Sequence, residues 1–300
     1  MEALEPRLLL DAGAVLDAAL DELLVTDRGL DVPPPGYNYS EQDAPAKGAG
    51  GAGVTKILNV PEYIWYHGCA PTSGGMILGY WDTVAYPNYF PGDASTQTND
   101  VNDRIASSGH IADYVPTPDR TPPPPYHTDD CIADFMLTSR VPDRHGWSNF
   151  GNVDDGFIDY SDFVGYSAAH SWNETYGDLT FGDLKAEIDA GRPMMFLVDS
   201  DGDGGTDHFV PIVGYRTDPS NQYGCHTTWN RAPGEPLVHW YDWQGKSNGH
   251  PWGIHGGTYF HPCWGSPDLA GVEANAYPEP RYWGDTLTFA YGVKNYGSAA

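Results

Sequence analysis

A single cysteine at the start of an apolar helix constrains this chain more than any other feature of its sequence. Residues 68–72 read Gly-Cys-Ala-Pro-Thr, and apolar side chains then recur on one face of a helix expected over Ala70–Trp81. Pro71 fits the first turn of that helix, where the missing N–H of proline is not needed. Gly68 permits a tight backbone approach just before it. This pattern predicts a central buried helix with Cys69 at its N-terminal end.

Cys69 stands where a thiol can become a nucleophile. The thiolate attacks rather than the thiol, and the free N–H groups and macrodipole of a helix N-terminus lower the pKa of a thiol. The alternative is a buried free cysteine that caps a core helix and has no reactivity. The motif by itself leaves both readings open.

A histidine at the mouth of an apolar strand supplies the base that such a thiol needs. Two apolar runs rich in β-forming residues, Met194–Val198 and Phe209–Tyr215, are predicted to be buried strands. His208 stands immediately before the second run. Histidine is the natural activator of a thiol, because small environmental shifts place its pKa near working pH.

Together these two segments resemble those of the C39-like, papain-fold cysteine peptidases. The resemblance rests on Gly-Cys-x-Pro-Thr at the start of a buried helix, and on His208 followed by an apolar strand ending in Gly214-Tyr215. It implies an α+β fold in which the N-terminal helix packs on an antiparallel β-sheet that presents His208. It also implies hydrolysis of a peptide or protein substrate, with Cys69 as nucleophile and no required cofactor.

The third catalytic position departs from the family pattern. Papain-like sites orient the histidine with Asn or Asp two residues before a Trp, and Thr227 occupies that position here. A threonine accepts the imidazole N–H but does not stabilise an imidazolium as a carboxylate does. Asn230 and Asp242 are therefore further candidates for the third member.

The oxyanion position departs as well. The glutamine that the family carries six residues before the nucleophile is replaced by Tyr63. Tyr63, Tyr66 and His67 are candidate donors to an oxyanion, beside the backbone N–H of Cys69. Because of both departures, a catalytically inactive peptidase fold used for adhesion or ligand binding is the alternative function.

An acidic, glycine-rich turn joins the two predicted strands. It begins like a calcium loop, with a glycine at the sixth position. Its candidate ligands are carboxylates: Asp199, Asp201, Asp203 and Asp207. The twelfth position holds Val210, so the bidentate Glu of an EF-hand is absent. The alternatives are a Ca²⁺ site that rigidifies the loop before His208, and a plain acidic turn.

The cysteines and the late histidines follow no known zinc pattern. Cys69, Cys131, Cys225 and Cys263 form no CxxC pair, which excludes a zinc ribbon and a disulfide-dense scaffold. If Cys69 is catalytic, at most one internal disulfide can form among the others. The late candidates for zinc have unrelated spacings, and we expect no zinc there: His239, His250, His255, His261 and Cys263.

The chain is predicted to divide into four segments. Residues 1–30 hold an amphipathic helix, with leucines at helical spacing over residues 1–24. Residues 31–54 are a linker rich in proline and glycine, which cannot offset its ordering entropy by burial. Residues 55–262 form the folded peptidase-like domain, and residues 267–300 begin a further β-rich segment.

Both ends of the chain resemble parts of bacterial surface proteins. Glu5–Ala12 resembles the LEPR-type start of large surface or secreted proteins, although a helix without a targeting role is the alternative. Pro267-Asp268-Leu269 and the alternating run Leu287–Val293 resemble the start of a CARDB-like repeat, an immunoglobulin-type sandwich that is incomplete here. These resemblances imply an extracellular or cell-surface location.

The charge balance restricts the partners of the protein. Lys and Arg number 15 against 41 Asp and Glu, a formal charge of −26. Such a surface repels phosphate backbones and anionic lipid, so no nucleic acid partner is expected. No apolar run approaches the roughly 18 residues of a transmembrane helix. The sequence indicates no oligomeric state.

Overall fold

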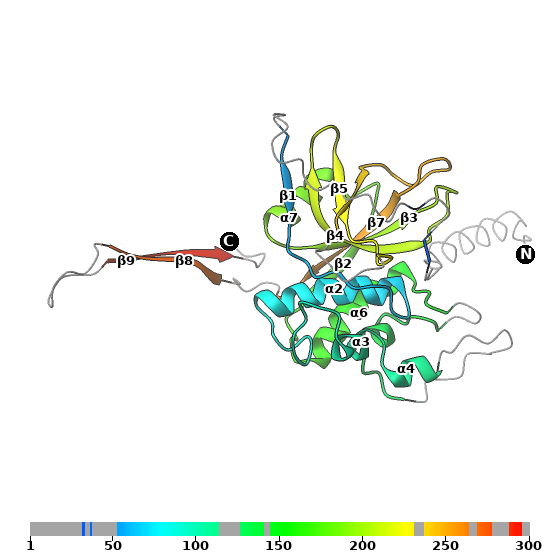
Figure 1. The fold of residues 1–300 in the computed structure, drawn as a ribbon, viewed down its shortest axis with the longest axis horizontal. Helices are drawn as coiled ribbons and strands as arrows, with labels where there is room; N and C mark the ends of the chain where they lie inside the picture. Colours follow the sequence, from blue (N-terminus) through cyan, green and yellow to red (C-terminus); the bar gives the residue numbers. More distant parts are fainter. Residues whose placement is uncertain are drawn as a thin grey trace, which may run out of the picture.

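The structure is a computed structural model in which a mixed helical layer covers a twisted sheet (Figure 1). It describes residues 32–33, 37, 53–113, 127–140, 145–230 and 237–263, and the backbone of 269–277 and 288–295. The predicted N-terminal helix, its LEPR-type start and most of the predicted linker lie outside the described residues.

Seven strands form one sheet in the order β2-β7-β3-β4-β5-β6, with β1 paired to β4. The strand pairs are antiparallel. The strands are β1 (Thr55–Ile57), β2 (His170–Thr175), β3 (Met194–Asp199), β4 (His208–Arg216), β5 (Gln222–Cys225), β6 (His239–Asp242) and β7 (Gly253–His261). The predicted antiparallel sheet is confirmed, and β4, which begins at His208, lies near its centre.

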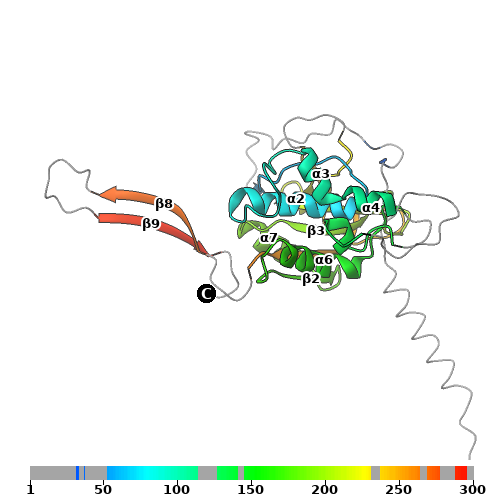
Figure 2. The same ribbon diagram turned by 90° about the horizontal axis from the view of Figure 1, so that it is seen from below.

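Helices cover both faces of this sheet. Their bounds are α2 (Cys69–Val84), α3 (Asn99–Ile105), α4 (Ser108–Asp113), α5 (Ile132–Phe135), α6 (Phe150–Phe163) and α7 (Phe181–Asp189). Helices α2, α3, α4 and α6 lie together on one side (Figures 1 and 2), whereas α7 packs on the other face through Leu184 and Ile188. The predicted α+β class is therefore confirmed.

The two central strands are apolar over most of their length because both of their faces are buried. In β3, Met195 and Leu197 belong to the core beneath α2, whereas Met194, Phe196 and Val198 belong to the core beneath α7. Side chains alternate between the two faces of a strand, so a strand between two cores needs apolar residues at every position.

Two short helices, α3 and α4, lie in a polar stretch after Tyr86 that carries no clear helical pattern. The Thr98 hydroxyl caps α3 by accepting from the Val101 N–H at 3.2 Å. Two buried apolar residues, Val101 and Ile105, are enough to dock this short polar helix on the core.

The C-terminal part contains a two-stranded sheet of its own. Strand β8 (Leu269–Tyr277) pairs antiparallel with β9 (Thr288–Asn295), apart from the main sheet (Figure 1). The strand expected over Leu287–Val293 agrees with β9. A CARDB-like sandwich built on this hairpin stays a prediction. Within the described ranges, no helix combines the length and apolarity needed to cross a bilayer.

Candidate active site

Cys69 is the first residue of α2 and is fully buried. Gly68 precedes it with a φ of 148°, a backbone conformation that side chains rarely adopt. A Cβ at this position would lie 2.8 Å from Cγ of Pro71 and 3.0 Å from Thr138 Cγ2. Glycine is therefore required for the chain to enter the helix with Cys69 at its N-terminus.

The first turn of α2 is fastened to β4 at the residue that follows His208. The backbone N–H of Phe209 donates to Cys69 Sγ at 3.4 Å. The hydroxyl of Ser73, one helical turn further on, donates to the backbone carbonyl of Phe209 at 3.0 Å. These two contacts set the register between helix and strand, and they bring the thiol of Cys69 next to the backbone of His208.

His208 is fully buried, and two groups hold its ring. Its Nε2 lies 2.8 Å from the backbone carbonyl oxygen of Thr227. The ring of Trp229 stacks on the imidazole with 3.7 Å between centroids and 12° between planes. A carbonyl only accepts, so Nε2 carries the proton, and in the neutral ring Nδ1 carries the lone pair.

The electrostatics of His208 favour the neutral imidazole. Burial lowers the pKa of His208 to about 3, against which the hydrogen bond to Thr227 acts only in part. Among the residues that the structure describes, Nδ1 has no hydrogen-bond partner. The ring is therefore set to accept a proton at Nδ1 rather than to carry one at rest.

Comparison with family models shows the family to which the chain belongs. Residues 57–248 match the family model described as the Peptidase_C39 like family, a span that contains Cys69 and His208. The chain belongs to the C39-like peptidase family. Its structure is similar to that of interpain A, a cysteine protease of Prevotella intermedia, with a TM-score of 0.40 and 12% identity over 75% of this chain and 99% of that one. A comparison with curated proteins found no match.

Of the three candidates for the third catalytic member, Thr227 and Asn230 both lie at the hydroxyl of Tyr37, whereas Asp242 lies elsewhere. Thr227 contacts His208, but through its backbone carbonyl, because its hydroxyl is hydrogen-bonded to Tyr37. The amide of Asn230 is bonded to Glu62. Asp242 lies opposite Gln222, at the far end of β5 from Thr227. Its carboxylate accepts from Ser220 at 2.6 Å.

Two of the oxyanion candidates, Tyr63 and Tyr66, lie at different points along α2. Tyr63 is fully buried, and its hydroxyl donates to the Ala94 carbonyl at 2.5 Å. This hydrogen bond holds the Tyr63 side chain beside the middle of α2, where it lies against Gly79. The backbone of Tyr66 is hydrogen-bonded to the first turn of α2, since its N–H donates to the Thr72 hydroxyl at 2.9 Å.

His67 is the candidate donor with unusual geometry. Its φ of 55° lies in the left-handed region, which is uncommon outside glycine. Its Nδ1 is buried and has no hydrogen-bond partner among the described residues. Burial and, less strongly, the nearby His145 and His110 lower the pKa of His67 to about 4, so the ring is neutral near pH 7. Strain of this kind concentrates at functional sites.

The acidic turn before His208 brings three of its four carboxylates together. Asp199, Asp201 and Asp203 have oxygens within 4.8 Å of one another. The Asp199 carboxylate already accepts from backbone N–H groups of the turn, including that of Gly202 at 2.7 Å. Asp207 points elsewhere and accepts from the N–H of Ser200 at 2.8 Å. Calcium binding at this acidic turn stays a prediction.

The late histidines do not gather at one point. His261 lies 2.9 Å from a carboxylate oxygen of Glu187, whereas His239 lies 3.3 Å from Asn230. Within the described ranges, neither belongs to a group of side chains arranged for a metal ion.

Tyr37 is a site residue that sequence reasoning missed, because it falls in the predicted linker. Its ring contacts Trp229 edge-on at 5.5 Å and lies 6.4 Å from Trp252, centroid to centroid. Its hydroxyl reaches the side chains of Thr227 and His239. A tyrosine in a segment rich in proline and glycine gives no local signal for such a contact.

Proposed function

We propose that this C39-like chain hydrolyses peptide bonds, with Cys69 as nucleophile and His208 as general base. The observation that carries the proposal is the Nε2 hydrogen bond of His208, which leaves the lone pair at Nδ1. Together with the contact between Phe209 N–H and Cys69 Sγ at 3.4 Å, it supports proton transfer from the thiol to Nδ1.

The reaction proceeds through an acyl enzyme. The Cys69 thiolate attacks the peptide carbonyl carbon, and the C–N bond breaks as His208 donates its Nδ1 proton to the leaving amine. A water molecule then gives a proton to Nδ1 and attacks the thioester carbon, which releases the acid and restores the thiol. The backbone N–H of Cys69, at the positive end of α2, stabilises the oxyanion.

Burial sets a condition on this mechanism. Cys69 and His208 are both inaccessible to solvent, so a substrate reaches them only after neighbouring groups move. The low pKa of His208, near 3, means that an imidazolium forms only beside a negative charge. The thiolate supplies that charge, so the two groups are expected to titrate as a pair.

The test is the pH dependence of iodoacetamide alkylation at Cys69, with the modified site mapped by mass spectrometry. We expect a midpoint well below the roughly 8.5 of a free thiol, and a rise toward that value in His208→Ala. Cys263, which is partly exposed, serves as the internal control thiol. Hydrolysis of labelled casein should require Cys69 and vanish in Cys69→Ala.

The rival is a catalytically inactive module that binds a ligand or surface. It is supported by the replacement of a side-chain third member with a backbone carbonyl. A Cys69 that alkylates no faster than Cys263 and is indifferent to His208→Ala would favour this rival and end the peptidase proposal. Extracellular or cell-surface placement stays a prediction from the sequence.

A further inference from the structure

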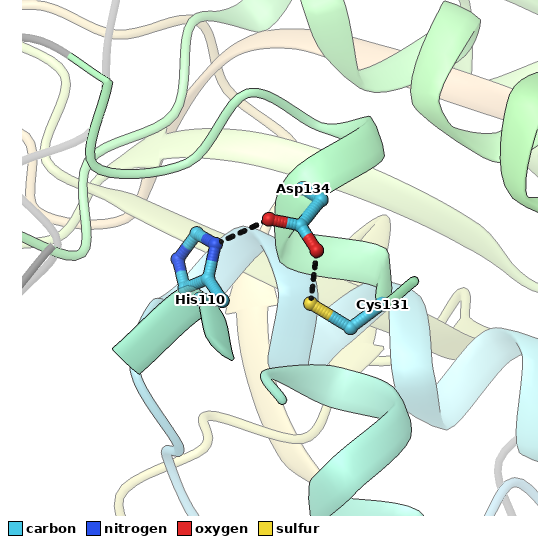
Figure 3. Close-up of side chains that lie close together, drawn as sticks. All are labelled: His110, Cys131 and Asp134. Carbon is cyan, nitrogen blue, oxygen red and sulfur yellow. Dashed lines mark hydrogen bonds and ion pairs between the residues drawn. The ribbon is translucent and has the colours of Figure 1, made fainter. Parts of the chain in front are cut away.

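The helical layer holds a second cluster of reactive side chains, centred on Asp134 of α5 (Figure 3). One carboxylate oxygen of Asp134 lies 2.8 Å from Nδ1 of His110, which is on α4. The other accepts from the thiol of Cys131 at 3.0 Å. All three residues are fully buried. Their ligand atoms lie within 4.8 Å of one another.

His127 completes this cluster from the other side. Its Nε2 lies 3.2 Å from the same oxygen of Asp134 that accepts from Cys131. Its Nδ1 lies 2.6 Å from the carboxylate of Asp113. In metal sites, a carboxylate commonly holds the far nitrogen of a ligating histidine in this way and so fixes the ring and its tautomer.

We propose that His110, His127, Cys131 and Asp134 bind one divalent transition-metal ion, with zinc the best chemical match, and that Asp113 orients His127. Two imidazoles, a thiolate and a carboxylate form a donor set suited to zinc, cobalt or nickel rather than to calcium or magnesium. Such a site lies outside the candidate active site and is not needed for its chemistry.

Asp134 lies close enough to each of the other three residues to share an ion with it. Ligands 2.0–2.3 Å from a tetrahedral zinc are roughly 3.5 Å apart. The three contacts to Asp134 measure 2.8, 3.0 and 3.2 Å. His110, Cys131 and Asp134 form one group within 4.8 Å, whereas His127 is grouped with Asp130 and Asp134, so the His127 ring has to move toward Cys131 and His110 before all four residues share one ion. Each contact holds a proton between two ligating atoms, and the ion would take the place of these protons.

The charges of the cluster favour a cation. Asp134 is fully buried, and its carboxylate lies at hydrogen-bond distance from His110, His127 and Cys131. A buried carboxylate that stays ionised needs positive charge beside it. The neighbouring surface pocket carries three carboxylates, of Asp100, Asp103 and Asp130, against the one cation of Arg104, and this excess of negative charge would draw a cation toward the cluster.

The surroundings of Cys131 do not favour its use as a second nucleophile. Burial, and then the charge of Asp134, raise the pKa of the Cys131 thiol well above its ordinary value. The thiol donates to a carboxylate, and among the described residues no imidazole accepts from it, so none of them is placed to activate it as a base. A purely hydrogen-bonded polar core is the remaining alternative. A metal would join α4 to α5 and so brace the helical layer.

The test measures Zn²⁺ and Co²⁺ binding to the full chain, prepared without a polyhistidine tag. All proteins carry Cys69→Ala, so the candidate active site contributes no thiolate. We expect one equivalent of Zn²⁺ to remain after dialysis, with protons released on binding. Co²⁺ should give a cobalt–thiolate charge-transfer band, which Cys131→Ser removes.

Matched variants separate the metal site from general damage. Cys225→Ser alters another buried thiol, and it should keep both the zinc and the cobalt band. His127→Gln changes a partly exposed ring and should weaken zinc binding while the fold survives. Asp113→Asn should weaken it about 10- to 100-fold and keep the band, as a positioning residue does.

Two results would overturn the proposal. One is a Cys69→Ala chain with no further change that retains far less than one equivalent of Zn²⁺ and shows no cobalt–thiolate band. The other is zinc binding that is equally strong in Cys131→Ser, His127→Gln and Cys225→Ser. Either would leave the cluster as a hydrogen-bonded core.

Discussion

At the scale of single residues, the partner of His208 is an atom that sequence comparison does not consider. The third position of the family pattern falls on Thr227, which does contact His208, but with its backbone carbonyl at 2.8 Å. A carbonyl orients the ring and selects the tautomer without a negative charge. The identity of the side chain at that position therefore matters less than the path of its backbone.

This argument predicts a mild effect of Thr227→Ala. Because the carbonyl remains, we expect casein hydrolysis to fall by less than about 10-fold, whereas loss of an orienting side chain costs up to about 10⁴-fold. Tyr37→Phe removes the same hydroxyl contact from the other side, so it should behave alike. A loss of several thousand-fold in Thr227→Ala alone would mean that the hydroxyl orients His208.

A second residue-scale prediction concerns His67 as oxyanion donor. We expect His67→Ala to lower kcat for casein by about 10²–10³-fold, the usual cost of losing one donor, and to leave the rate of Cys69 alkylation unchanged. His67→Asn should recover part of the loss, because Asn tolerates the left-handed backbone and its amide can donate. Equal kcat values in wild type and His67→Ala would remove His67 from the site.

At the scale of elements, the site depends on how α2 is fastened to β4. The strand binds the first turn of the helix through both backbone groups of Phe209, one to Cys69 and one to Ser73. The helix brings the thiol and the strand brings the imidazole, so the contact between the elements determines whether the two can react.

We therefore expect Ser73→Ala to slow both alkylation of Cys69 and casein hydrolysis. The substitution leaves a buried carbonyl without one donor and should cost about 1–3 kcal/mol of unfolding free energy, measured in urea. Ser171→Ala is the matched control, since its hydroxyl also donates to a backbone carbonyl, that of Tyr259 at 2.6 Å, but between β2 and β7. If both variants slow alkylation equally, the effect comes from stability and not from register.

At the scale of the whole molecule, buried neutral histidines couple folding to pH. Mainly through burial, the pKa falls to about 3 for His208 and to about 4 for His67, His239 and His255. The unfolded chain binds these protons at a pH near 6.5, above the folded values. Between about pH 6.5 and 4 the unfolded state holds more protons, so stability falls as the pH falls.

The free energy of unfolding of His239→Gln should therefore fall less steeply than that of the wild type as the pH is lowered. The free energy of unfolding, measured in urea from pH 7 to 4, should lose up to about 1.4 kcal/mol per pH unit of its slope, the contribution of one proton. His250→Gln is the control, because that side chain is exposed. An unchanged slope in His239→Gln would show that His239 is protonated in the folded protein as well.

Local sequence patterns determined the parts of the site that depend on neighbours along the chain. The glycine, cysteine and proline that begin α2, and the apolar runs of β3 and β4, carry their signals within a few residues. They predicted the α+β class and the family, and they single out Cys69 and His208 as the candidate nucleophile and base. Local patterns did not predict α6. Its apolar residues stand at helical spacing, but they are interrupted by aspartates and by Gly156, which lowers the helix propensity of the segment.

The tertiary structure alone decided which atoms face one another. Only packing turns the Tyr63 hydroxyl to Ala94 and brings Thr227 to His208 through its carbonyl. Only packing gathers His110 and Asp134 from separate helices. Such contacts join residues far apart in sequence and depend on the register between elements. Local patterns carry the residue types of a site, but the distances between its atoms come from the packing of the whole core.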